Sequence, residues 1–231
     1  MRELLTCGAC WGALLTIGAF ALGTLLNRKT GKDWCNPLLL AGVFVMVFLS
    51  VFGIPYAEYQ ASAAPVSYLL LPATVSLAVP LYEKWELLKN NFAAITAGIA
   101  AGTLTSLGSI TAIAWLLKLS RAQAVSLLPK SVTTAIGMDV AAELGGMAAL
   151  SGAVIVLTGI AGNLLAEWVC RVFHITDPMS KGIGIGTASH AIGTSKALQL
   201  GQVEGAMSGL AIAVAGVLTA FLSPVAVHFL P

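Results

Sequence analysis

The spacing of the charged residues constrains this chain more than any other feature. Among its 231 residues are only 12 basic and 10 acidic ones, and six runs of 23 to 28 residues carry no charge. A helix needs about 20 mainly apolar residues to cross the hydrocarbon core of a bilayer. The charge-free runs therefore predict membrane-spanning helices, and they cover residues 4–27, 34–57, 59–82, 90–117, 144–166 and 205–231.

The composition excludes several other classes of protein. Hydrophobic residues make up 58% of the chain, charged residues 10%, and the mean hydropathy is +0.90. Soluble domains carry about 25% charged residues, so a water-soluble enzyme and a disordered segment are both excluded. The net charge of +2 provides no basic surface for a nucleic-acid partner. We predict an all-α integral membrane protein that passes through the bilayer several times.

We predict about 7–8 membrane segments in a single membrane domain, 1–231. The apolar N-terminal run is interpreted as the first membrane helix rather than a cleaved signal, because it is longer than a typical signal core. An amphipathic stretch over 118–145 separates the fourth helix from the fifth. The expected helices cover about 5–26, 37–53, 66–82, 92–117, 147–170, 179–199 and 205–229.

The segment 131–145 allows two topologies. If it crosses the membrane, Arg171 and Lys181 lie outside; if it is re-entrant or interfacial, they lie on the cytoplasmic side, where Lys and Arg are in excess in membrane proteins. Its length and its two carboxylates favour the second topology, and both remain open.

The re-entrant topology implies an inverted repeat. An offset near 114 places 37–53 over 151–167 and 92–117 over 206–231, and it aligns two stretches rich in helix breakers. The first half, 1–120, then has a broken helix near 72–80, and the second half, 121–231, has one near 186–194. Interrupted helices at corresponding places in two halves indicate the binding site of a transporter.

The first broken stretch contains Pro72 and Pro80. Both prolines lack the backbone N–H and clash with the preceding turn. Backbone groups freed in this way at membrane depth must face protein or a watery cavity. We expect Thr74 and Ser76 to complete one wall of a substrate site; the alternative is a kinked helix in which both hydroxyls bond to their own backbone.

The second stretch, 181–196, combines glycines, hydroxyls, a histidine and two lysines in an apolar region. Glycines permit close backbone approach to a ligand, and N–H groups at the start of a half-helix attract anions. An imidazole ordinarily titrates near neutral pH, so proton coupling is predicted for His190. The alternative is close packing of small residues, with the His190 ring bonded to a neighbouring carbonyl. The candidate substrate ligands are Thr187, Ser189, His190, Thr194, Ser195 and Lys196.

The third polar segment begins after Pro129. Lys130, Ser131, Thr133 and Thr134 are predicted to face an anionic substrate at the start of a helix. Asp139 and Glu143 follow at i,i+4 spacing, which places them on one helix face. They are candidates for proton or cation coupling, and the alternative is a solvated acidic face.

No pattern of residues predicts a catalytic or metal centre. Cys7 and Cys10 form a lone C-x-x-C, which lacks the second ligand pair of a metal site. The chain has no Ser-His-Asp order and no phosphate loop. We therefore predict a protein without enzymatic activity, cofactor or metal.

Several motifs occur together along this chain. They are Asn36-Pro37, PATVSLAVPLY at 72–82, PKSVTT at 129–134, Asp177-Pro178, GTASHAIGTSKAL at 186–198 and EGAMS at 204–208. Together they resemble the LrgB/CidB family of membrane proteins, over about residues 20–230. Two departures from the usual family sequence are Ala135, where proline is common, and Asp139, where glutamate is common.

This resemblance implies a bacterial inner-membrane protein and two competing functions. The family was named antiholin-like, for modulating murein hydrolase export and lysis beside a small LrgA/CidA-type membrane protein. Relatives, including a plastid glycolate/glycerate translocator, are linked to short carboxylates such as pyruvate. The resemblance also implies distant kinship with elevator-type transporters, which commonly form homodimers.

From the residues and the resemblance together, we expect a secondary transporter of small monocarboxylates such as glycolate, glycerate or pyruvate, with Lys130 or Lys196 offsetting the substrate charge. The alternative is an antiholin-like regulator.

Overall fold

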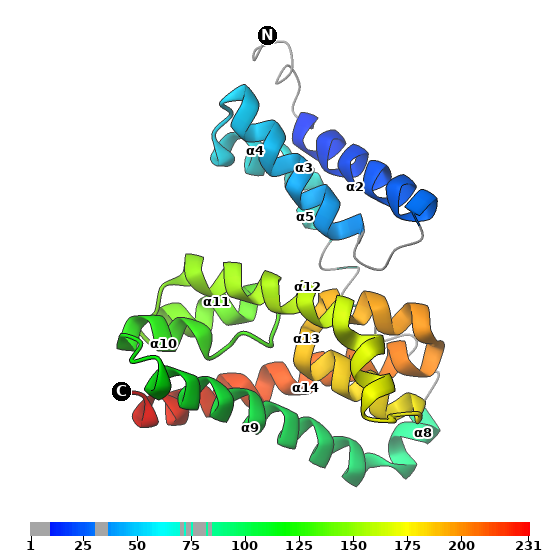
Figure 1. The fold of residues 1–231 in the computed structure, drawn as a ribbon, viewed down its shortest axis with the longest axis vertical. Helices are drawn as coiled ribbons and strands as arrows, with labels where there is room; N and C mark the ends of the chain where they lie inside the picture. Colours follow the sequence, from blue (N-terminus) through cyan, green and yellow to red (C-terminus); the bar gives the residue numbers. More distant parts are fainter. Residues whose placement is uncertain (1–9, 31–36, 70–71, 73–74, 76–81, 83–84) are drawn as a thin grey trace. The chain divides into compact units, whose positions relative to one another are not determined.

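The structure is a computed structural model that describes residues 10–30, 37–69, 72, 75, 82 and 85–231. In this part of the chain the residues form helices and turns, with no β-strand among them (Figure 1). The chain falls into two compact units, Met1–Ser76 and Leu77–Pro231. This boundary divides the chain by how its residues pack, and it differs from the boundary at 120/121 between the two predicted repeat halves. The inverted repeat stays a prediction. The predicted residues Thr74, Ser76 and Pro80 lie outside the described residues.

The first unit is built on two apolar helices, α2 (Trp11–Thr30) and α3 (Pro37–Phe52). They are followed by two short helices, α4 (Tyr56–Ser62) and α5 (Ala64–Tyr68). The Oγ1 of Thr16 lies 2.7 Å from the hydroxyl of Tyr59, which fixes α4 against α2. The structure confirms the predicted start of the second helix at Pro37, whose missing N–H is harmless at a helix start.

The second unit contains three helices that are long and apolar enough to cross a membrane, among the residues the structure describes. These are α9 (Phe92–Leu116), α12 (Ala148–Val172) and the continuous stretch Gln202–Phe229. The last comprises α14 (Gln202–Ala226) and the 3-10 helix η1 (Val227–Phe229). The remaining helices of the unit are α8 (Trp85–Asn90), α10 (Arg121–Leu127), α11 (Thr134–Glu143) and α13 (Pro178–Leu200).

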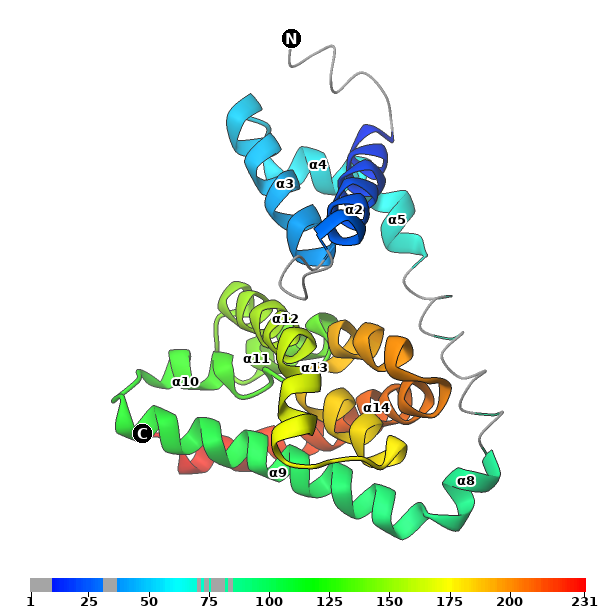
Figure 2. The same cartoon turned by 45° about the vertical axis from the view of Figure 1, so that its right-hand side comes forward.

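Helices α9 and α14 form the apolar core of the second unit and lie side by side (Figure 2). One buried cluster joins Ile95 and Ile99 of α9 to Met207 and small residues of α14. At the other end, the indole N–H of Trp115 donates to the carbonyl of Phe229 at 2.7 Å. The small residues of α14 let α13 approach it closely, so these two helices carry the candidate site.

The segment 118–145 folds into two short helices rather than one span. The Ser120 side chain and Gln123 form a reciprocal capping box that starts α10. Helix α11 has 10 residues, which corresponds to a length of about 15 Å and is half of the hydrocarbon thickness. The hydroxyl of Ser126 accepts from the backbone N–H of Met147 at 2.7 Å, and this bond ties the end of the segment back to its beginning. The length of α11 favours the re-entrant or interfacial topology.

Helix α13 begins at a cap that the sequence encodes locally. The carboxylate of Asp177 accepts from the backbone N–H of Ser180 at 2.8 Å and from its hydroxyl at 2.7 Å. Pro178 occupies the first helical position, where proline is favoured. These bonds, the backbone one foremost, lower the pKa of the exposed Asp177 carboxyl below its ordinary value.

We expect Asp177→Ala to lower the free energy of unfolding by about 1 kcal/mol, because the start of α13 loses its cap. Since the pKa is lowered in the folded state, this stabilisation is complete above the ordinary Asp pKa of about 3.9 and disappears as the pH falls through the folded value. The melting temperatures of the two proteins in detergent should therefore differ at pH 7 and converge in acid. An equal difference at every pH would contradict the assignment.

Candidate functional site

Helix α13 is interrupted at His190. This residue has φ 44° and ψ −142° inside an otherwise helical stretch, a region of backbone space that residues other than glycine rarely occupy. The two segments of α13 consequently run in different directions (Figures 1 and 2). His190 lies within the stretch 186–194 where the sequence predicts a broken helix. Its side chain is 2% exposed, so the interruption is deep inside the unit.

The His190 ring is held by α12. Its Nε2–H donates to the carbonyl of Ile155 at 2.9 Å. The ring fits against Gly159, where a Cβ atom would lie 2.7 Å from Cε1 of the imidazole. On the other side, the Thr194 hydroxyl donates to the His190 carbonyl at 3.0 Å and lies 2.7 Å from the Ser208 hydroxyl of α14. The interruption is therefore fixed from two helices.

Small residues allow this close packing. A Cβ atom on Gly186 would overlap the backbone of Ser208, and one on Gly162 would overlap the side chain of Ser189. Ser189 is itself buried. The predicted residues Ser189, His190 and Thr194 are thus brought together between α12 and α14.

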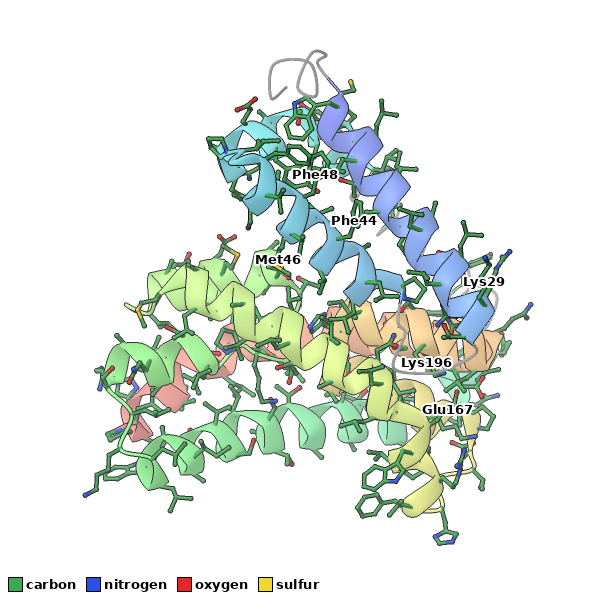
Figure 3. All side chains as sticks on the ribbon, turned by 45° about the horizontal axis from the view of Figure 1, so that its top comes forward. Lys29, Phe44, Met46, Phe48, Glu167 and Lys196 are labelled. Carbon is green, nitrogen blue, oxygen red and sulfur yellow. The ribbon has the colours of Figure 1, made fainter. Side chains whose placement is uncertain are left out.

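The segment of α13 after the interruption pairs with α12 through polar groups. The Asn163 side-chain amide donates to the Ile192 carbonyl at 2.9 Å and to the Ser195 hydroxyl at 3.0 Å. One turn further, Lys196 and Glu167 form an ion pair at 2.6 Å (Figure 3). The lysine charge is therefore already matched by a carboxylate. Asn163 and Glu167 are i,i+4 in sequence, and this spacing was the available signal for a polar face on α12.

A second polar cluster forms around Lys130. Its ammonium donates to the hydroxyls of Ser106 at 3.2 Å and Ser131 at 3.0 Å, and these two oxygens are themselves 3.0 Å apart. Ser131 is buried. Sequence reasoning found Lys130 and Ser131 but missed Ser106, because it lies in a long apolar helix far away in the chain. The other predicted residues of this segment, Thr133 and Thr134, start α11, and the Thr133 side chain makes no capping bond.

Among the residues that the structure describes, three further hydroxyls are buried without a hydrogen-bond partner. They are Oγ1 of Thr187 in α13, Oγ1 of Thr103 in α9 and Oγ of Ser223 in α14. Gly102 lies directly against Thr187, so α9 and α13 touch at this level. A buried hydroxyl without a partner is costly, which makes these groups candidates for contact with a ligand.

Asp139 and Glu143 are exposed on α11. Within the described part of the chain, no group of three or more His, Cys, Asp or Glu side chains is placed to hold a metal ion. The role of Asp139 and Glu143 in proton or cation coupling stays a prediction.

The described residues form helices without a strand, three of these helices are long and apolar enough to cross a membrane, and α13 has a buried polar interruption; these features define an integral membrane protein. The LrgB-like family model matches residues 16–229, and the chain therefore belongs to the LrgB family. It is 33% identical over 221 residues to the Antiholin-like protein LrgB of Bacillus subtilis (strain 168), covering 95% of this chain and 96% of that protein. No solved structure matches the chain. The resemblance deduced from the motifs is thus confirmed.

Proposed function

We propose that this protein has an antiholin-like function in the bacterial inner membrane, modulating murein hydrolase export and lysis together with a small LrgA/CidA-type membrane protein. The observation that carries the proposal is the match, along nearly the whole length of both chains, to a relative named antiholin-like. This proposal assigns the chain no enzymatic activity.

The test is complementation of a strain that lacks its own LrgB-family gene. We expect the intact gene to restore the wild-type rate of detergent-induced autolysis when it is expressed with its small partner gene. A rate that stays at the level of the empty vector, with the protein present in the membrane, would contradict the antiholin-like function.

A second candidate function is transport of small monocarboxylates, and the interruption of α13 favours it. A protein that acts only by contacting a partner needs no helix broken among buried polar groups. A transporter does, because backbone and side-chain groups must face the substrate at membrane depth. Ser189, His190 and Thr194 meet at this interruption, between α12 and α14.

Uptake by purified protein in liposomes tests this second function. We expect saturable counterflow of labelled glycolate, pyruvate or lactate, and a dependence on a pH gradient if His190 couples a proton. Adding the small partner protein shows whether it is required, and crosslinking in the bilayer shows whether the chain forms homodimers. Absence of uptake by folded protein, with and without the partner, would contradict the transport function, and the antiholin-like function would be the one that remains.

A further inference from the structure

We propose that Lys130, Ser106 and Ser131 form the binding point for one carboxylate group, with Ser106 of α9 as a ligand that no sequence motif marks. The inference rests on the second candidate function, since it names where a monocarboxylate would be held. It also separates the roles of the two lysines that the sequence left as alternatives.

The charge of Lys130 is the first argument. Its ammonium contacts two neutral hydroxyls, and no carboxylate lies within ion-pair distance of it among the residues that the structure describes. Lys196, in contrast, is paired with Glu167. A partly buried cation without a counter-charge is costly, and a bound monoanion would remove that cost. Lys130 is therefore the lysine suited to offset a substrate charge.

The arrangement of the two hydroxyls is the second argument. A serine hydroxyl offers one proton and two acceptor positions. Ser106 and Ser131 each accept from Lys130 and share one further hydrogen bond with each other. If a carboxylate replaces that shared bond, both hydroxyls can turn their protons toward its two oxygens while the ammonium stays beside them. Three donors from α9 and from the turn before α11 then surround one carboxylate.

The surroundings extend this polar surface. Ser106 lies four residues after Gly102, on the same face of α9 and about one helical turn along it. Gly102 contacts Thr187, whose buried hydroxyl has no partner. Helix α11 begins three residues after Ser131 without a side-chain cap, so its uncapped first N–H groups add positive potential. A single cation in this position favours a monoanion over a dianion.

The experiment measures the thermal stability of the purified full-length protein in detergent as acetate is titrated at constant ionic strength with sodium chloride. A ligand that binds only the folded state raises the melting temperature, because it raises the free energy of unfolding by RT ln(1 + [L]/Kd). We expect acetate to stabilise the wild-type protein, and neutral acetamide to have no effect. An equal shift with chloride in place of acetate would overturn the assignment to a carboxylate.

Variants locate the site. We expect Lys130→Met and Ser106→Ala each to weaken acetate binding by about tenfold or more, the loss for one to two charged hydrogen bonds. Ser109→Ala is the matched control, because Ser109 is exposed on the same helix, and its hydroxyl donates only to the Ser106 carbonyl at 2.8 Å. If Lys130→Met does not fold, two other single variants carry the test. Lys130→Arg keeps the positive charge and should retain acetate binding, whereas Ser106→Ala should weaken it.

Failure of the carboxylate site and failure of the transport function give different experimental results. Unchanged acetate binding in Lys130→Met and Ser106→Ala would overturn this site while leaving transport intact. Uptake by the wild-type protein without any acetate-dependent stabilisation would do the same. Loss of binding in both variants, with binding kept in Ser109→Ala, supports the site even if liposome uptake requires the small partner protein.

Discussion

Gly186→Ala is expected to lower the free energy of unfolding by about 2 to 3 kcal/mol, the upper range for overpacking a tight helix contact. The added Cβ would overlap the Ser208 carbonyl and lie 2.8 Å from its Cα. Both are backbone atoms of α14, so no side-chain rotation relieves the clash and the two helices must separate. Their separation would also break the hydrogen bond between Thr194 and Ser208, which fixes the interruption of α13.

Gly184→Ala is the matched control for this prediction. It lies two residues earlier in the same helix, and a Cβ atom there meets nothing within 4 Å. Alanine in a helix interior is more stable than glycine by about 0.5 to 1 kcal/mol, so this variant should be neutral or slightly stabilised. Melting curves in detergent, followed by autolysis and uptake measurements, compare the two. Equal melting temperatures for both variants would contradict the close packing of α13 on α14.

The sequence predicted the long helices of the second unit well because the signal is local, whereas most of the helix expected over 66–82 lies outside the described residues. Charge-free runs are bounded by the residues that cannot enter the hydrocarbon, and the expected helix 92–117 corresponds to Phe92–Leu116 in the structure. The start of α13 was equally readable, since Asp177 and Pro178 form a cap within four residues. His190, where the backbone of α13 leaves the helical conformation, lies within the stretch 186–194, although the sequence did not mark it as that residue.

Pairings between distant elements were not predictable in the same way. Two lysines were candidates for offsetting a substrate charge, and the sequence could not separate them. The structure places Glu167 of α12 beside Lys196, whereas the polar contacts of the Lys130 ammonium within the described residues are two hydroxyls. The partner Ser106 sits 24 residues before Lys130, in a helix without charged residues, and its sequence gives no sign of which of its several hydroxyls faces Lys130. Such contacts depend on how helices pack, which residue spacing within one helix does not encode.

His190→Ala is expected to be less stable than His190→Gly, the reverse of the order in an ordinary helix. Both variants lose the ring, its bond to the Ile155 carbonyl and its packing against Gly159, at a cost of about 2 to 4 kcal/mol. Alanine must still adopt φ 44° and ψ −142°, a strained conformation that costs an L residue about 1 to 3 kcal/mol. Glycine adopts it freely, so this part of the cost is recovered.

The control is Ala188→Gly, two residues earlier and exposed on the same helix. There glycine should cost about 1 kcal/mol, as it does in any exposed helix interior. The compared quantity is the stability of the glycine protein minus that of the alanine protein at each position, measured by denaturant or thermal unfolding. A negative difference at 188 and a positive one at 190 would establish that the backbone at His190 is held in this conformation; the same sign at both positions would contradict it.

Because neither His190 variant has an imidazole, the more stable of the two, His190→Gly, also tests the chemistry of the ring. If it folds but loses the pH dependence of uptake, the ring carries the proton, and if uptake keeps its pH dependence, the ring serves only to hold the interruption in place.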